Sequence, residues 1–321
     1  MLKSKLNIEL PGKEAIALIA DNIKPYIHRT PVMTSRLLNE MTGCSLFFKC
    51  ENFQKTGSFK IRGAMNAVLK LTDKQKARGV VTHSSGNFAQ ALAYAAKRAD
   101  ISAKIVMPEN VIAAKRDAVL GYGAEIIYSG SRPSDRETKC EEIRLITGAE
   151  FIHPSNDINV ISGHTSCAIE LIEDTETLDY VITPVGGGGL LSGISLGFYH
   201  FSPATKIIAG EPLNASDAFE SLKAGKIIPV KDPDTIADGL RTSLGDITFP
   251  IIKQFVEKII TVTEGEIVSA MRLVWERMKI IIEPSSAVAF AALLRNIEEF
   301  KNKNIGIIVS GGNVDISRMP F

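Results

Sequence analysis

The sequence predicts an α/β protein in which two domains are interleaved along the chain, each with a mainly parallel sheet flanked by helices. Three observations lead to this prediction. Apolar runs of strand length alternate with helical runs through most of the 321 residues, and strands joined by helical crossovers pair in parallel. Glycine-rich loops stand between strand-like and helix-like runs, where such folds bind ligands. No repeat, low-complexity tract or linker divides the chain into separate units.

The N-terminal part alternates in this way from the start. Helical periodicity covers 14–24, and Thr30-Pro31 is extended because a residue before proline avoids the helical region. A strand-like run at 45–50 and a helix-like run at 65–71 enclose a stretch rich in Gly, Ser and Lys.

The next run of the chain reads as a compact unit of four strands and three helices, so we expect a small domain at 76–155. The large domain then combines 1–75 with 156–321. In the small domain we expect strands at 79–83, 101–107, 124–128 and 150–153, and helices at 86–97, 112–122 and 135–146. Beyond it we expect helices at 160–172, 190–201, 246–257, 264–279 and 284–297, and strands at 180–185, 206–209 and 305–309.

Composition excludes several classes of function. The 37 basic and 36 acidic residues are interspersed, with a net charge of +1, so we expect no nucleic-acid partner. No apolar run reaches the roughly 18 residues of a membrane span, and the first residues lack the apolar core of a signal peptide. The four cysteines form no Cys-x-x-Cys pair, and the five histidines have no zinc spacing. We expect a cytoplasmic, enzyme-like protein with reduced thiols.

Lys60 is the first candidate for chemistry. It lies in Lys55-Thr-Gly-Ser-Phe-Lys-Ile-Arg-Gly63, where Gly57 and Ser58 are expected to start a helix with Ser58 as its N-cap. The positive end of the helix dipole disfavours the protonated amine. A neutral amine is the form that condenses with an aldehyde. The alternative is a solvated lysine on a helix face.

Three loops carry the remaining chemistry. Gly186, Gly187, Gly188 and Gly189 follow a strand and precede a helix, which suits a phosphate cradle of backbone amides; the alternative is a flexible turn. Ser84-Ser-Gly-Asn87 suits a carboxylate or a ring oxygen; the alternative is ordinary capping. Ser310 in Ser310-Gly-Gly-Asn313 could hydrogen-bond a ring nitrogen, or this loop could be a simple turn. Pyridoxal phosphate has the aldehyde, phosphate, hydroxyl and ring nitrogen that these four features would bind.

At this point the chain resembles the serine racemase and serine/threonine dehydratase family of fold-type II pyridoxal-phosphate enzymes, whose fold is like that of the tryptophan synthase β chain. The resemblance runs nearly end to end. It is carried by His28-Arg-Thr-Pro31, Lys49 to Ala64, Ser84-Ser-Gly-Asn87, Gly186 to Gly189, Ile236-Ala-Asp-Gly239, Glu283-Pro284 and Ser310-Gly-Gly-Asn313.

The resemblance implies roles for the residues of these motifs. Lys60 would be the Schiff-base lysine and a base on one face of the substrate. Phe59 and Asn87 would flank the ring and its hydroxyl, and Ser310 would meet the pyridine nitrogen. The phosphate would be held by Gly186, Gly187, Gly188, Gly189 and the amide of Leu190.

The substrate residues follow from the same resemblance. Ser85 would be the acid on the face opposite Lys60 that racemisation needs, or else only a helix-capping serine. Ser84 and Asn87 share its loop. Arg136 and Thr242 stand where racemase-like proteins place polar groups near the substrate carboxylate; a surface salt bridge is the alternative for Arg136.

A divalent cation is also implied. Glu211 and Asp217, with the Ala215 carbonyl, resemble the family's cation loop and offer hard oxygen ligands for Mg²⁺, Ca²⁺ or Mn²⁺; the alternative is a solvated acid pair.

The chain departs from the family at four places. Phe88 replaces the usual His, Ala89 follows where racemases often have Gly, Gly163-His-Thr-Ser166 replaces Gly-Gln-Gly-Thr, and Ser155 replaces Asn. These changes bear on substrate identity and leave the cofactor residues intact.

Several functions follow from the resemblance and the residues together. The first is a dehydratase that converts L-serine or L-threonine-type β-hydroxy amino acids to a 2-oxo acid and ammonia. The alternatives are an amino-acid racemase using Lys60 and Ser85 in the same site, a 3-hydroxyaspartate dehydratase, and a non-catalytic phosphate- or nucleotide-binding module. The family also implies a homodimer that acts on a small amino-acid substrate.

Overall fold

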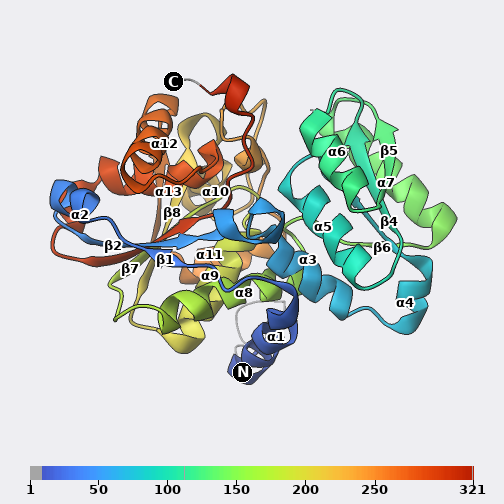
Figure 1. Ribbon diagram of the computed structural model, residues 1–321, viewed down its shortest axis with the longest axis horizontal. Helices are drawn as coiled ribbons and strands as arrows, with labels where there is room; N and C mark the ends of the chain where they lie inside the picture. The colour runs from blue at the N-terminus through green and yellow to red at the C-terminus, as the bar shows by residue number, and fades with distance from the viewer. Residues whose placement is uncertain (1–8, 112, 320) are drawn as a thin grey trace.

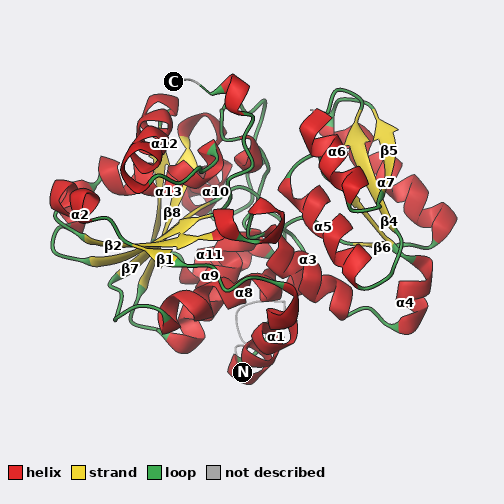
Figure 2. Ribbon diagram, in the orientation of Figure 1, coloured by secondary structure: helices red, strands yellow, loops and turns green. Residues whose placement is uncertain are grey.

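The structure is a computed structural model that describes residues 9–111, 113–319 and 321. Helices and strands alternate along the chain and form two separate sheets, each flanked by helices (Figures 1 and 2). The predicted α/β class with mainly parallel sheets is confirmed. Among the described residues, no helix combines the length and the apolar character needed to cross a bilayer.

The larger sheet has six strands in the order β1-β2-β10-β7-β8-β9. β1 runs antiparallel to β2, and all other pairs in this sheet are parallel. The last strand of the chain therefore lies between the second and the seventh. The bounds are β1 Val32–Met33, β2 Ser45–Cys50, β7 Tyr180–Pro184, β8 Lys206–Pro212, β9 Lys258–Val262 and β10 Asn304–Val309.

Helices bury both faces of this sheet. One face packs against α8, α9 and α11, and the other packs against α12 and α13, as Figure 1 shows. Such two-sided burial explains why these strands read as nearly continuous apolar runs. The helices of this part are α1 Lys13–Ile23, α2 Arg36–Thr42, α3 Lys60–Leu69, α8 Ile158–Glu173, α9 Gly189–Phe201, α10 Asp217–Ala224, α11 Thr248–Phe255, α12 Glu264–Met278, α13 Pro284–Arg295 and α14 Ile297–Phe300.

The smaller sheet has four parallel strands in the order β5-β4-β3-β6. Its elements are α4 Asp73–Arg78, β3 Val80–His83, α5 Asn87–Arg98, β4 Ala103–Pro108, α6 Ala113–Gly121, β5 Glu125–Ser129, α7 Pro133–Thr147 and β6 Glu150–Phe151. All four strands come from one continuous stretch of chain. We therefore propose that the domains divide where the sequence suggested, with 76–155 as the small domain.

Some elements differ from the sequence-based expectation. The helix expected at 246–257 ends at Phe255, and the chain then forms strand β9, which was not predicted. A five-residue segment between two helices gives only a weak local indication of a strand. The segment forms β9 because its backbone hydrogen-bonds with β8. Helices α2 and α10 were also not predicted. The start expected for a helix at residue 112 lies outside the described residues.

The carboxyl ends of the parallel strands bring the predicted loops to one edge of the large sheet. Cys50 of β2 stands beside Val309 of β10, and Ile307 of β10 stands beside Ile182 of β7. The segments that follow β2, β7 and β10 hold Lys60, the four glycines and Ser310. This is the edge where open α/β sheets bind ligands.

Candidate active site

Lys60 is the first residue of α3 and remains partly exposed. Its Nζ donates to the Pro154 carbonyl oxygen at 2.8 Å. The same atom lies 5.0 Å from the centre of the Phe59 ring and 5.7 Å from that of Phe88. Loss of hydration disfavours the charged amine and lowers the pKa of Lys60 to about 8. A larger neutral fraction than in an ordinary lysine is therefore available for nucleophilic chemistry near neutral pH.

The turn before Lys60 differs from the expected helix start. Thr56 and Gly57 both have positive φ, 63° and 71°, and Ser58 is extended with φ −163°. Ser58 forms an isolated antiparallel bridge with Gly311, and Phe59 occupies the N-cap position of α3. The prediction that Ser58 caps the helix is wrong, because the bridge to the segment after β10 holds its backbone in an extended conformation.

A buried ion cluster anchors α3 two residues beyond Lys60. The Arg62 guanidinium, fully buried, donates to both oxygens of Glu51 at 2.7 and 2.8 Å and to both oxygens of Glu170 at 2.7 Å. Lys49, also fully buried, donates to Glu170 at 2.7 Å. Lys49 also lies 3.9 Å from Asp174, whose side chain is partly exposed. The cluster joins β2, α3 and α8. It fixes the helix that carries Lys60.

The four glycines form a tight turn between β7 and α9. Gly188 has φ +82°, which favours glycine. A Cβ on Gly186 would lie 2.9 Å from the Leu240 Cα, and one on Gly187 would lie 2.4 Å from the Ser155 Oγ. The loop is therefore a cradle whose backbone any side chain would obstruct.

This cradle presents unused backbone donors. The first amide to bond at the start of α9 is that of Ser192, which donates to the Gly188 carbonyl oxygen at 2.9 Å. Within the described part of the chain, no amide from residue 186 to Leu191 donates a hydrogen bond. Free amides at a helix N-terminus bind phosphate well. The observation fits the phosphate of pyridoxal phosphate and includes the predicted Leu190 amide.

Ser310 lies close to the segment that carries the lysine. Its carbonyl oxygen accepts from the Phe59 amide at 3.0 Å. Its hydroxyl lies 2.9 Å from the Ser286 hydroxyl, and Ser286 also donates to the Gly311 carbonyl oxygen at 2.7 Å. Sequence reasoning did not name Ser286, because nothing in its helix marks it out before the fold places it behind Ser310.

Asn87 begins α5 and reaches across to the large sheet. Its Nδ2 lies 3.0 Å from each carboxylate oxygen of Glu283, and its Oδ1 accepts from Asn313 Nδ2 at 3.0 Å. Burial raises the pKa of Glu283 to about 7. Glu283 and Asn313 appeared in the sequence only inside quoted motifs, so their connection to Asn87 emerges from the fold.

The predicted substrate residues are placed less completely. Ser84 and Ser85 follow β3 and are partly exposed, and the Ser84 hydroxyl accepts from the Gly86 amide at 3.4 Å. The Thr242 Oγ1 would lie 3.3 Å from a Cβ on Gly186, which puts Thr242 beside the cradle. Arg136 is partly exposed in α7, and burial lowers the pKa of its guanidinium. Arg136 makes no salt bridge to a described residue.

The positions that depart from the family pattern lie in the interior. Phe88 is 2% exposed and packs between α3 and the small sheet. His164 is fully buried against the Phe59 ring, with ring centres 4.7 Å apart, and neither ring nitrogen has a partner in the described part of the chain. Ser155 lies under the glycine cradle. These three positions lie close to Lys60, Phe59 and the cradle.

The predicted cation residues gather at the end of β8. The Glu211 carboxylate accepts from the amides of Ala218 and Phe219 at 2.8 Å each, and Asp217 Oδ2 accepts from Leu244 at 3.2 Å. Burial raises the pKa of Glu211 to about 8 and that of Asp217 to about 7. Asp217 Oδ1 is buried without a partner among the described residues. Among all described residues, no group of three or more His, Cys, Asp or Glu side chains is arranged to hold a metal ion.

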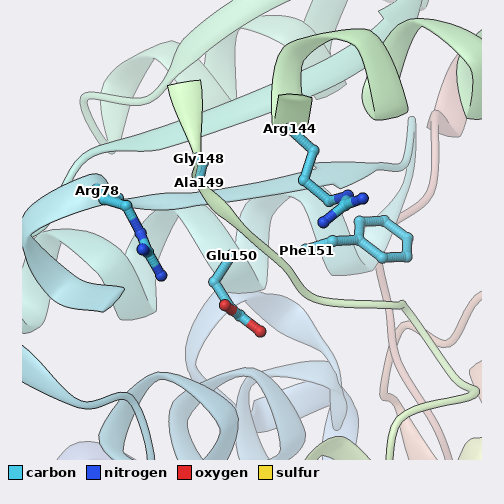
Figure 3. Close-up of a pocket in the computed structure, with 6 residues that line it drawn as sticks. All are labelled: Arg78, Arg144, Gly148, Ala149, Glu150 and Phe151. Carbon is cyan, nitrogen blue, oxygen red and sulfur yellow. The ribbon is translucent and has the colours of Figure 1, made fainter. Parts of the chain in front are cut away.

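A separate cavity of about 450 Å³ lies at the opposite edge of the small sheet. Figure 3 shows Arg78 and Arg144 on either side of Glu150, next to Phe151. These residues precede β3 and β6 or begin β6, whereas Ser84 and Pro154 follow those strands. The cavity therefore does not belong to the site around Lys60.

The chain is similar to known proteins over most of its length. The family model described as "Pyridoxal-phosphate dependent enzyme" matches residues 23–311. The chain is 47% identical over 312 residues to the beta-hydroxyaspartate dehydratase of Paracoccus denitrificans, covering 97% of this chain and 99% of the relative. It is 49% identical over 306 residues to the serine racemase of Arabidopsis thaliana, covering 93% and 92%. The solved structure of maize serine racemase superposes with a TM-score of 0.93 at 45% identity, covering 96% of this chain and 95% of that one.

Proposed function

The chain belongs to the pyridoxal-phosphate dependent enzymes, and from that premise we propose that it is a dehydratase of β-hydroxy amino acids. The reaction converts an L-serine or L-threonine-type substrate to a 2-oxo acid and ammonia. Membership of an enzyme family sets aside the non-catalytic phosphate-binding module.

The residues around Lys60 fit the cofactor. The cradle of Gly186 to Gly189, with the Leu190 amide, would hold the phosphate, because its amides are unused and a Cβ would fill the space. Phe59 and Asn87 would flank the ring, and Ser310 would meet its nitrogen. When bound, pyridoxal phosphate supplies an aldehyde that condenses with an amine and a ring that withdraws electrons from the substrate Cα.

The Lys60 amine is the observation that carries the proposal. Lys60 is partly exposed, and its pKa of about 8 lets its amine take a proton from the substrate Cα and release it again near neutral pH. A carboxylate beside the ring nitrogen would keep that nitrogen protonated, whereas the Ser310 hydroxyl leaves it largely unprotonated. An unprotonated ring withdraws electrons less strongly, which favours prompt loss of a β-hydroxyl over a long-lived carbanion.

Racemisation is the second candidate, and Ser85 supports it. Ser85 is partly exposed on the loop that holds Asn87, and its hydroxyl has no hydrogen bond to any described residue. A free hydroxyl there could return a proton on the face opposite Lys60. The substrate could also carry a second carboxylate, as in 3-hydroxyaspartate, since one relative acts on that compound by name. Arg136, without a salt bridge to a described residue, could receive it.

We also propose that a divalent cation, Mg²⁺, Ca²⁺ or Mn²⁺, binds at Glu211, Asp217 and the Ala215 carbonyl. The buried, unpartnered Asp217 Oδ1 fits a hard cation, as do two carboxylates whose pKa values are raised by burial. A bound cation would stabilise both carboxylates in their ionised form.

Homodimer formation and cytoplasmic location remain proposals. A second copy could cover the exposed apolar side chains near the C-terminus: Ile281 is 47% exposed and Phe321 45%. Phe321 packs on Trp275, whose indole donates to the Ile282 carbonyl oxygen, so these side chains share one region.

The test is a product assay of purified protein with pyridoxal phosphate and Mg²⁺. L-Serine, L-threonine and L-threo-3-hydroxyaspartate are supplied separately, and 2-oxo acid and D-amino acid are measured in the same tube. Mainly 2-oxo acid is expected; mainly D-amino acid would replace dehydration with racemisation. Lys60→Ala should lose both turnover and the visible absorbance of the bound cofactor. Substantial turnover in that variant would refute the assignment.

A further inference from the structure

Three polar side chains from distant segments form a hydrogen-bonded chain beside Lys60. Glu283 stands at the N-cap of α13, Asn87 begins α5, and Asn313 follows β10. Asn87 lies between the other two, bonded to Glu283 through its nitrogen and to Asn313 through its oxygen. Glu283 is close enough to Lys60 for its charge to raise the pKa of that amine, against the larger effect of burial.

Both ends of this chain accept hydrogen bonds. The Glu283 carboxyl oxygens accept from Asn87 Nδ2. The backbone carbonyl oxygen of Thr56, which can only accept, receives a hydrogen bond from Asn313 Nδ2 at 2.8 Å and fixes the direction of the chain. Asn313 therefore spends both hydrogens of its amide, one on Thr56 and one on Asn87 Oδ1. The orientation of each asparagine amide follows from the network.

One N–H of the Asn87 side chain is left without an acceptor among the described residues. Asn87 Nδ2 lies 3.0 Å from both oxygens of Glu283. Two oxygens of one carboxylate are too close together to receive the two diverging hydrogens of an amide, so one N–H serves both. The second N–H of Asn87 has no partner among the described residues.

Backbone contacts hold Glu283 in place. Its amide donates to the Gly311 carbonyl oxygen at 3.0 Å, and its own carbonyl oxygen accepts from the Ser286 amide at 2.9 Å. Glu283 is 4% exposed, and a Cβ on Gly311 would lie 2.9 Å from its Oε1. Close packing on this side and the hydrogen bond from Asn87 favour the observed position of the carboxyl group.

We propose that Glu283 and Asn313 are positioning residues that hold the Asn87 amide so that it offers an N–H, and not its carbonyl oxygen, to the ring hydroxyl of the cofactor. This inference rests on the cofactor site of the proposed function. The two residues act through Asn87 and need not touch the cofactor themselves. A hydrogen bond donated to that oxygen stabilises its ionised form.

Glu283→Gln tests the inference with little change of shape. A glutamine can donate as well as accept, so the Asn87 amide could flip and present its oxygen instead of its nitrogen to residue 283. Removing a buried charge also relieves a desolvation cost, so the variant should fold. The measurements are the apparent dissociation constant for pyridoxal phosphate and the absorbance maximum of the bound cofactor, both without amino acid. The matched control is Glu276→Gln, the same change at an exposed carboxylate that pairs with Arg272.

A double-mutant cycle separates action through Asn87 from direct action. We expect Asn87→Ala to weaken cofactor binding about tenfold and Glu283→Gln about three- to tenfold, the range of one hydrogen bond. Both should shift the absorbance maximum. In the Asn87→Ala background, Glu283→Gln should change binding less than twofold. Asn313→Ala should follow the same pattern, which provides a second variant.

Two results would overturn the inference. Equal losses from Glu283→Gln with and without Asn87 would show that the carboxylate acts on its own. An unchanged absorbance maximum and affinity in Glu283→Gln would show that it does not act at all. Neither readout uses the product. If the product is a D-amino acid but the binding free energies of Asn87→Ala and Glu283→Gln are not additive, only the proposal of dehydration is refuted. If the product is a 2-oxo acid but these free energies are additive, only this inference is refuted.

Discussion

Replacing Arg62 with leucine should destabilise the protein strongly, although the side chain touches no ligand. The guanidinium makes four hydrogen bonds of 2.7 to 2.8 Å to Glu51 and Glu170 inside the core. Arg62→Leu leaves two carboxylates with Lys49 as the one cation that contacts Glu170 in the described cluster. Glu51, fully buried, then pairs with no cation among the described residues.

The size of the effect follows from that count. Removing one partner of a buried ion pair costs about 3 to 5 kcal/mol, because the remaining charge stays desolvated. Arg62→Leu combined with Glu51→Gln removes the stranded charge, and we expect it to recover about 2 to 3 kcal/mol of the loss. Arg36→Leu is the matched control: Arg36 pairs with Glu40 at 3.6 Å with its side chain 93% exposed. Such an exposed pair is worth about 0 to 1 kcal/mol.

Urea unfolding of the cofactor-free protein measures these differences. The single tryptophan, Trp275, is partly buried against the core on one face of the large sheet and reports unfolding of the domain that holds Arg62. The midpoint should fall in Arg62→Leu with an unchanged denaturant slope. A loss below about 1 kcal/mol, equal to that of Arg36→Leu, would refute the reasoning. The reasoning would also be refuted if the double variant lost as much free energy of unfolding as the two single variants lose in total.

The remaining predictions concern the site. Ser85→Ala should abolish D-amino acid formation and spare dehydration of L-serine; unchanged racemisation in a chiral product assay would remove Ser85 from that role. Gly188→Ala should lower stability by about 2 to 4 kcal/mol and weaken phosphate binding. The reasons are its φ of +82° and a Cβ 2.7 Å from Ile252; thermal unfolding and cofactor titration would measure both effects. In EDTA, the unfolding temperature should fall as pH rises from about 5 to 8 and level off above 8. The pKa values of Asp217 and Glu211 are raised to about 7 and 8 in the folded state, so the native protein binds protons that the unfolded chain has released. Added Mg²⁺ should raise the unfolding temperature more at pH 8.5 than at pH 6, and an equal rise at both would count against the cation site.

Much of this architecture was predictable from local pattern. The alternation of apolar runs with helical runs identified α8, α9 and α13 within a few residues, because side-chain periodicity is a property of neighbouring residues. The glycine run and the lysine-bearing stretch were recognisable for a similar reason. Each of these features is confined to fewer than ten consecutive residues.

Three outcomes depended on residues far apart in the sequence. The placement of β10 between β2 and β7 joins residues 45–50 to residues 304–309, which no local period encodes. Ser58 has the residue type of a helix cap, yet the bridge to Gly311 holds it extended. The partners of Asn87 lie 196 and 226 residues away.

The sequence by itself therefore determined the order and type of most elements and the identity of Lys60, the glycine cradle and Ser310 as candidates. The tertiary structure alone decided the strand order, the buried ion cluster behind Lys60 and the orientation of the Asn87 amide. The physical reason is that periodicity and turn chemistry act between near neighbours. Burial, pKa and hydrogen-bond partnership depend instead on which distant segments the fold brings into contact.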